Sequence, residues 1–273
     1  MEPWEAAVLG LVEGATEFLP VSSTGHLIVA QRLLGIPDSR AVHAFAICIQ
    51  AGAILAVFAV FLRRLSALGR GLLGKDAAGR RLALQLVLAL VPAAISAKLF
   101  QSEIKQHLFG LWPVAAALFV GGLVLLAWPL LRRGRPEGGT PLEGLSWRAA
   151  FGIGCVQCLA LWPGTSRSLA TLAGGLVFGL SSAAAVEFSL LLGFVTLGAA
   201  TVDQAFEHGA VMVAELGALN LAIGFVAAFA SAWIAVRALV RMLERGGLAG
   251  FGWYRIALAA LLALALANGW LAS

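Results

Sequence analysis

The sequence predicts an all-α polytopic membrane protein with about six transmembrane helices plus two re-entrant helix pairs in an inverted-topology repeat. Hydrophobic residues make up 60% of the 273 residues, only 12% are charged, and the mean hydropathy is +0.92. A soluble domain of this length needs more polar surface to cover its core. Apolar runs long enough to cross about 30 Å of hydrocarbon recur along the chain. We therefore expect a single integral membrane domain over residues 1–273.

Six apolar stretches are the expected transmembrane helices: 41–62, 82–100, 111–131, 183–202, 211–236 and 250–272. Most basic residues fall into three loops between them, which hold Arg63, Arg64, Arg70, Lys75, Arg80 and Arg81, then Arg132, Arg133, Arg135 and Arg148, and finally Arg237, Arg241, Arg245 and Arg255. Short basic loops lie on the cytoplasmic side of a membrane. This distribution explains the net charge of +5 without nucleic acid as a partner.

Two further segments, 2–34 and 147–180, must then enter and leave on one side each, the first on the outer side and the second on the cytoplasmic side. Each is broken at a proline followed by Ser or Thr, and Pro20 matches Pro163 in this respect. One re-entrant pair plus three spans, occurring twice in opposite orientation, is an inverted repeat. We place repeat 1 at about 1–131 and repeat 2 at about 147–273.

The first broken segment carries two carboxylates. Glu13 and Glu17 are four residues apart, so both lie on one face of a helix. Ionisable groups inside a membrane usually mark a functional path, whereas the alternative is a solvated helix face at the outer rim. Pro20 ends this helix, and three residues of capping type follow it: Ser22, Ser23 and Thr24. A helix that starts there directs its free N–H groups toward one point, which favours an anion.

Two cationic or titratable residues complete the candidate site. His26 lies one turn into the second helix, where it can act as a nucleophile, acid or base. Arg167 follows Pro163 at a helix start, where the helix dipole disfavours a cation, so it needs an anionic partner: a substrate or the carboxylate pair. The hydroxyl residues around Arg167 that we expect to bind phosphate are Ser166, Ser168 and Thr171. If the halves pack as inverted repeats, the two broken tips meet.

Carboxylates beside a phosphate site call for a bridging cation. Oxygen ligands suit Mg²⁺ or Ca²⁺, so Glu13 and Glu17 are the candidate ligands of a divalent cation. Ser23 and His26 are both candidate nucleophiles, and the residue types alone do not decide between them. Arg167 is expected to stabilise the phosphate oxygens.

The remaining polar residues are weaker candidates. Gln50 and Gln157 either pair across helices or touch the ion. Asp203, Glu207 and His208 are expected in a solvated loop between two spans, and Gly121-Gly122 is expected to permit close helix packing. The cysteines in Cys155-x-x-Cys158 are interpreted as buried small hydrophobic residues, because no second Cys/His pair accompanies them.

The residues Glu13-Gly-x-Thr-Glu17-Phe-Leu-Pro-Val-Ser-Ser-Thr-Gly-His26 and Pro163-Gly-x-Ser-Arg167-Ser-x-x-Thr171 resemble the two signature motifs of the undecaprenyl-diphosphate phosphatases of the BacA/UppP type. The resemblance covers the whole chain. It implies hydrolysis of the terminal phosphate of a polyprenyl diphosphate to recycle the lipid carrier of the cell wall, a process linked to bacitracin resistance. It also implies a divalent cation, a multi-pass location in the bacterial inner membrane and an active site facing the periplasm.

By this resemblance Glu13 and Glu17 serve the cation or act as acid and base, Ser22, Ser23 and His26 hold or attack phosphate, and Ser166, Arg167 and Thr171 bind it. The expected partners are the lipid substrate and membrane lipid, with a homodimer as the candidate assembly. Two positions depart from the family pattern: Ala46, where an acidic residue is usual, and the proline-free Gly193-Phe194-Val195. One alternative is a transporter or flippase of the phosphorylated carrier. The other is a membrane scaffold, but a scaffold would leave the buried Glu13, Glu17 and Arg167 unexplained.

Overall fold

A computed structural model describes residues 1–271 except 38, 132–137 and 245–247. Helices account for nearly all of the described chain, and the described residues contain no β-strand, only an isolated bridge between Thr140 and Leu180. The helices are α1 (Pro3–Glu17), α2 (Ser23–Leu33), α3 (Arg40–Val60), α4 (Leu62–Leu72), α5 (Ala77–Leu99), α6 (Gln101–Leu108), α7 (Leu111–Leu131), η1 (Leu142–Gly144), α8 (Trp147–Gln157), η2 (Cys158–Leu161), α9 (Arg167–Val177), α10 (Ser182–Leu216), α11 (Ala218–Glu244) and α12 (Ala249–Ala267).

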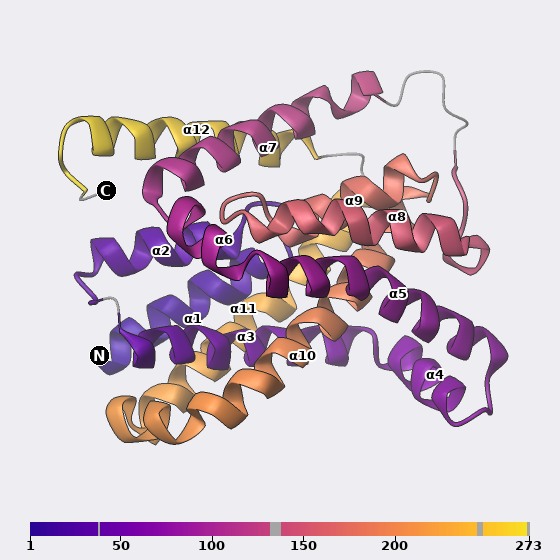
Figure 1. Cartoon of the computed structure of the whole chain (residues 1–273), viewed down its shortest axis with the longest axis horizontal. Coiled ribbons are helices and arrows are strands. Elements are labelled where there is room, and N and C mark those ends of the chain that lie inside the picture. Colours follow the sequence, from indigo (N-terminus) through magenta and orange to yellow (C-terminus); the bar gives the residue numbers. More distant parts are fainter. Residues whose placement is uncertain (38, 132–137, 245–247, 272–273) are drawn as a thin grey trace.

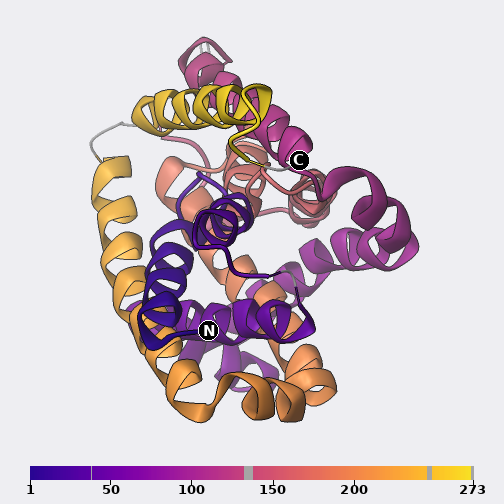
Figure 2. The same cartoon turned by 90° about the vertical axis from the view of Figure 1, so that its left-hand side faces the viewer.

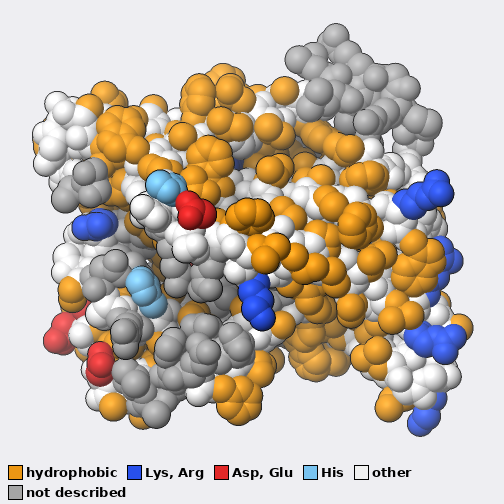
Figure 3. Space-filling view, in the orientation of Figure 1, with side chains coloured by type: hydrophobic (Ala, Val, Ile, Leu, Met, Phe, Trp, Pro, Cys, Tyr) orange, Lys and Arg blue, Asp and Glu red, His pale blue; other side chains and the backbone are white. Residues whose placement is uncertain are grey.

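Six helices in the described part of the chain are long and apolar enough to cross a membrane, which confirms the predicted multi-pass architecture. Their apolar stretches are Ala41–Val60, Ala77–Leu99, Leu111–Trp128, Ser182–Val202, Ala218–Met242 and Ala249–Ala267. Large apolar side chains on these helices point outward and cover much of the visible face (Figure 3). An apolar exterior of this extent fits a lipid environment.

One predicted loop is wrong. The segment that contains Asp203, Glu207 and His208 is helical, because α10 continues to Leu216. The break comes at Gly217, whose φ of +77° suits glycine, and α11 starts at the next residue. Polar residues do not end a helix by themselves, so the interpretation of these charged residues as a loop placed the end of the helix too early. The predicted solvation of these three side chains lies outside what the structure describes.

The two broken segments form helix pairs that lie among longer helices (Figures 1 and 2). α1 starts at the N-terminal side of the molecule and α2 returns to that side, whereas α8 starts at the opposite side and α9 returns there (Figure 1). Lys and Arg side chains gather at the end where α4 and α5 meet and α8 starts, which is the right-hand edge of Figure 3. The first pair therefore enters from the side opposite the basic end.

Packing between the two halves is reciprocal. α1 packs on α11, α8 packs on α5, and α3 and α10 pack on each other. Each broken pair thus rests on the second long span of the other half, as expected for an inverted repeat. The contact is close in both cases: a Cβ at Gly10 of α1 would lie 2.3 Å from the Gly224 oxygen, and a Cβ at Gly154 of α8 would lie 2.4 Å from the Ala89 oxygen.

The basic segment between α3 and α5 is not an open loop, because α4 occupies most of it. α4 carries Leu62, Leu65, Leu68 and Leu72 among its arginines, so it is strongly amphipathic. Arg64 of this helix forms ion pairs with Glu187 at 2.5 Å and with Glu143 at 2.9 Å. Glu187 of α10 is therefore bound to α4.

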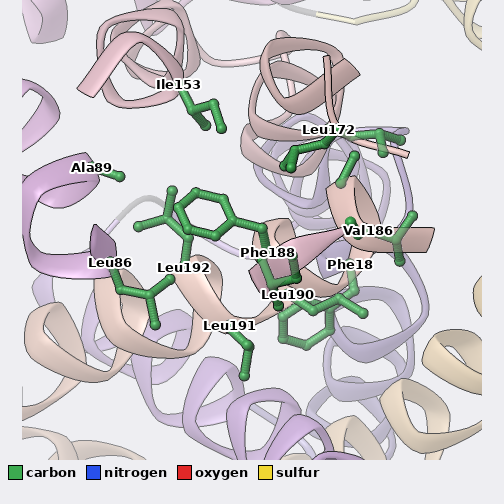
Figure 4. Packing of buried hydrophobic residues seen from close by; sticks show 14 of the residues in the cluster. Phe18, Leu86, Ala89, Ile153, Leu172, Val186, Phe188, Leu190, Leu191 and Leu192 are labelled. Atoms are coloured by element: carbon green, nitrogen blue, oxygen red, sulfur yellow. The ribbon is translucent and has the colours of Figure 1, made fainter. Parts of the chain in front are cut away.

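A buried hydrophobic cluster lies between α10 and the two broken pairs (Figure 4). Its members include Phe18 beside α1, Ile153 of α8, Leu172 of α9 and Phe188 of α10, and the Phe18 and Phe188 side chains are fully buried. Close packing of this kind has low compliance. The cluster therefore fixes how the tips of the broken pairs sit on α10.

Candidate active site

Both predicted breaks are present, and a serine caps the helix that follows each. α1 ends at Glu17 and α2 starts at Ser23, where the Ser22 hydroxyl accepts a hydrogen bond from the Gly25 N–H at 3.4 Å. In the second pair, the Ser166 hydroxyl accepts a hydrogen bond from the Leu169 N–H at 3.2 Å at the start of α9. The first turns of α2 and α9 therefore begin at the two tips, each with its positive dipole end there.

Ser22 and Ser166 are the only non-glycine residues with positive φ among the residues that the structure describes, at +74° and +76°. A residue with a side chain adopts such a conformation at a cost of about 1–3 kcal/mol and keeps it only when its surroundings enforce it. By backbone conformation, Ser22 of the first tip corresponds to Ser166 of the second. If the tips are instead aligned on Pro20 and Pro163, Ser22 corresponds to Thr165. Such strain clusters at functional sites.

An ion pair joins the two tips. Arg167 Nη2 donates to Glu17 Oε1 at 2.8 Å, and the side chains are only 12% and 5% exposed. The Ser23 hydroxyl donates to the other carboxylate oxygen, Glu17 Oε2. Arg167 Nη1 donates to the Ser189 carbonyl at 3.1 Å, and the guanidinium lies 5.5 Å from the centre of the Phe18 ring. The predicted meeting of the tips and the anionic partner of Arg167 are thus both present.

Glu13 lies on the same face of α1 as Glu17 and is 1% exposed. Its Oε1 has no hydrogen-bond partner, and its electrostatic neighbours are Glu17, Gln50 and Arg167. A buried carboxylate oxygen without a donor is costly unless a cation or an added donor meets it. The Arg167 Nε is also buried without a hydrogen-bond partner. The cluster therefore contains one buried acceptor, Glu13 Oε1, and one buried donor, Arg167 Nε, that have no hydrogen-bond partner.

The donor set fits a hard divalent cation bound through two carboxylates. No group of three or more His, Cys, Asp or Glu residues suited to a metal ion occurs within the described part of the chain. Mg²⁺ keeps several waters and commonly uses one or two carboxylates together with substrate phosphates. Glu13 and Glu17 meet this minimal requirement: Glu13 Oε1 is open, whereas the two Glu17 oxygens already accept from Arg167 and Ser23.

The hydroxyls of the second tip bind the first tip directly. The Ser168 hydroxyl donates to the Leu19 carbonyl at 2.7 Å, and the Ser166 and Ser168 hydroxyls are 2.9 Å apart. Thr171 is fully buried, where its hydroxyl donates to the Arg167 carbonyl at 2.9 Å and contacts the Ser189 hydroxyl. In this structure, Ser166 and Ser168 hold the tips together, whereas Thr171 supports the first turn of α9 against α10.

His26 and Thr24 lie apart from the buried cluster. His26 Nδ1 is 2.6 Å from the Ser22 carbonyl oxygen, and His26 Nε2 is 2.6 Å from the Tyr254 hydroxyl. The two rings stack with centres 5.7 Å apart. Both imidazole nitrogens are therefore engaged, whereas the Thr24 side chain is exposed in the first turn of α2. Neither side chain therefore takes part in the hydrogen bonds around the Glu17–Arg167 ion pair that the described residues form.

The prediction that Arg255 belongs to a basic cytoplasmic loop is wrong. It lies in α12, is 0% exposed, and donates to backbone carbonyls at both tips: Pro20 at 3.0 Å, Gly164 at 2.8 Å and Thr165 at 3.2 Å. The sequence signal was its position inside the predicted span 250–272, because a charge within a span usually has a function. Gly121 leaves room for it, since a Cβ there would lie 2.1 Å from Arg255 Nη2.

Gly193 is a second residue whose role was not expected from the sequence. A Cβ at this residue of α10 would lie 2.0 Å from Arg167 Nη1, so the absence of a side chain makes room for the guanidinium. The position falls in the stretch Gly193-Phe194-Val195 that departs from the family pattern. Ser189, one turn earlier, supplies the carbonyl that binds the same guanidinium. α10 is thus shaped around Arg167.

Fold and site together define a class: a polytopic membrane protein whose two broken helix pairs meet tip to tip around a buried Glu–Arg pair. The family model described as bacitracin resistance protein BacA matches residues 6–261. The chain belongs to this family.

Curated relatives match almost the full length. An undecaprenyl-diphosphatase of Sorangium cellulosum is 50% identical over 94% of this chain and 84% of its own length. Undecaprenyl-diphosphatase 2 of Rhodospirillum rubrum is 46% identical over 97% of this chain and 94% of its own. An undecaprenyl-diphosphatase of Methylococcus capsulatus is 47% identical over 92% of this chain and 90% of its own.

Proposed function

We propose that this chain is an undecaprenyl-diphosphatase that hydrolyses the terminal phosphate of a polyprenyl diphosphate and so recycles the lipid carrier of cell-wall synthesis. The relatives' activity supports the substrate class. The single observation that carries the chemistry is the buried array in which the Glu17 carboxylate accepts from both Ser23 and Arg167. It combines a hydroxyl, a base and a cation in one desolvated place.

We propose Ser23 as the nucleophile, with Glu17 as its base. The Ser23 oxygen attacks the terminal phosphorus while its proton passes to Glu17, and the bond from that phosphorus to the bridging oxygen breaks. The polyprenyl monophosphate leaves with the bridging oxygen, and water then hydrolyses the phosphoserine. His26 is a weaker nucleophile in this geometry, because Ser22 and Tyr254 engage its two ring nitrogens.

Arg167 and the helix starts bind the phosphate in this proposal. The Arg167 Nε is a free buried donor, and the first N–H groups of α2 and α9 add partial positive charge. Ser22, Ser166 and Ser168 surround the tips, and Thr171 holds the first turn of α9. Glu13 and Glu17 would hold the divalent cation, which supplies neutralisation of the diphosphate charge when it is bound.

The proposed orientation places the site toward the outer face of the bacterial inner membrane. The first broken pair enters from the end opposite the basic residues, and basic ends are cytoplasmic (Figures 1 and 3). Two exposed positions test this: Arg32→Cys in the last turn of α2 and Lys75→Cys between α4 and α5, each made in a chain without native cysteines. An impermeant thiol reagent added to intact cells should label only the first, and the reverse pattern would refute the orientation.

The activity is tested by phosphate release from a prenyl diphosphate by purified protein, with and without chelator. We expect release with Mg²⁺ or Ca²⁺ and its loss on chelation. No release with any divalent ion would refute the enzyme assignment, and transport of the intact lipid phosphate would then be the function to assay. The proposed homodimer is tested separately by the mass of the detergent-solubilised protein.

A further inference from the structure

We propose that Arg255 is a positioning residue that holds both broken tips in their strained conformations, so that one side chain of the last helix sets the geometry of both halves of the site. This inference rests on the proposed function for its kinetic consequences only. Its structural content concerns the backbone of the tips and is tested without substrate.

The guanidinium is buried between three elements. Its five hydrogen bonds to described residues all end on backbone carbonyls: Pro20, Ala117, Leu118, Gly164 and Thr165, at 2.8 to 3.3 Å. Two of these carbonyls belong to α7, one to the first tip and two to the second. A planar group with donors in fixed directions suits several carbonyls at once, which a lysine ammonium does not reproduce.

The carbonyls that Arg255 binds have a particular relation to the strained serines. Pro20 lies two residues before Ser22, and Gly164 lies two residues before Ser166. The same guanidinium therefore fixes the peptide that leads into each positive-φ serine. Because such a conformation persists only where its surroundings enforce it, these bonds are the physical reason that both serines keep it.

The neighbouring residue acts on the same turn. Tyr254 binds His26 through its hydroxyl, and His26 in turn binds the Ser22 carbonyl. α12 thus contacts the residues on both sides of Ser23: Pro20 before it and His26 after it. The Ser23 hydroxyl binds Glu17 rather than α12, so the influence of this helix on the proposed nucleophile is indirect.

A purely structural alternative is that Arg255 only anchors α12 on α7, through Ala117 and Leu118. Two adjacent glycines of α7 separate the alternatives. A Cβ at Gly121 would lie 2.1 Å from Arg255 Nη2, whereas a Cβ at Gly122 would lie 2.7 Å from the Ile256 side chain and 2.9 Å from the Gly252 carbonyl oxygen. Both substitutions disturb the contact between α7 and α12. The methyl group at Gly121 would meet the Arg255 guanidinium, whereas the one at Gly122 would approach only the Cβ of Arg255, at 3.3 Å.

The experiment compares Arg255→Gln, Arg255→Lys, Gly121→Ala and Gly122→Ala in detergent or nanodiscs by amide hydrogen exchange. We expect Arg255→Gln and Gly121→Ala to lose protection at residues 20–26 and 163–169 together, with the rest of the chain unchanged. Gly122→Ala should keep protection at both tips. Loss at one tip only, at neither, or equally in Gly122→Ala would overturn the proposal. If Arg255→Gln does not fold, the comparison of the two alanine variants decides.

Kinetics supply the second readout. Misplacement of reacting groups by about 1 Å costs on the order of 10²-fold in rate, so kcat should fall about 10²-fold in Gly121→Ala and much less in Gly122→Ala. Arg255→Lys keeps the charge without the fork, and we expect it to stay as slow as Arg255→Gln. Full rescue by lysine would show that charge alone matters and overturn the positioning role. Inactivity of the wild type would refute the proposed function, while the exchange result would still stand.

Discussion

Arg167 Nη2 lies 2.8 Å from Glu17 Oε1, although the two residues are 150 positions apart and belong to different broken helix pairs. The pair is almost fully removed from solvent. A buried ion pair contributes little net stability, but removal of one partner is strongly destabilising because the other charge stays buried. The pair therefore specifies how the two tips fit together. In the proposed mechanism it also sets the base, Glu17, beside the guanidinium that binds the phosphate.

Arg167→Ala should destabilise the protein by about 3–5 kcal/mol, because the Glu17 carboxylate is left buried without its cation. It should also lower phosphate release by about 10²–10³-fold, because the guanidinium that donates hydrogen bonds to the phosphate is lost. Thermal unfolding and phosphate release measure the two effects. The double variant Arg167→Met with Glu17→Gln should regain stability but not activity, and a double variant that regained turnover would show that the pair is only structural.

Ser23→Ala should remove the nucleophile and lower the rate by about 10³-fold or more, while the protein still inserts and folds. In the wild type, acid quenching during turnover should trap phosphate on Ser23, as identified by mass spectrometry. Tyr254→Phe is the matched control for the other candidate, because it frees His26 Nε2 without changing Ser23. A phosphohistidine at His26 in either protein would contradict the assignment.

Gly193→Ala should displace the Arg167 guanidinium, since the added Cβ would lie 2.0 Å from Nη1. We expect kcat to fall by about 10²-fold, as for other small misplacements of a catalytic group. Gly198→Ala on the same helix is the control, because a Cβ there meets nothing within 4 Å. Equal rates for the two variants would mean that Arg167 need not occupy its observed position.

Glu13→Gln should weaken the response to divalent cation rather than remove the nucleophile. The substitution retains the shape of the side chain but removes the charge beside the open oxygen position. The Mg²⁺ concentration for half-maximal activity should rise at least about tenfold, which corresponds to about 1.4 kcal/mol of binding free energy. An unchanged Mg²⁺ titration would remove Glu13 from the set of ligands.

The helix breaks and their meeting were predictable because they depend on local signals. Prolines, capping serines and a carboxylate pair are visible in the sequence, and an arginine at a helix start demands an anionic partner. The two strained serines were not predictable in the same way. Ser22 and Ser166 adopt positive φ for tertiary reasons, since the carbonyls that precede them are bound by a residue of α12.

Residues whose roles depend on distant contacts were misplaced or missed. Arg255 resembles the other arginines at the ends of spans, and only the three-dimensional fold shows that it is buried. Gly193 carries no chemical signal, because its function is the space it leaves for Arg167. The end of α10 was misplaced because charged residues were interpreted as a loop, whereas the backbone break depends on Gly217.

The contact of Arg255 with both tips has a consequence for how this chain can vary. The carbonyls of Pro20 and Gly164 bind the same guanidinium, whose donors point in fixed directions. A substitution that moves one tip therefore alters the geometry that is left for the other. At this point the two halves of the chain cannot change independently, so their tips are constrained to vary together.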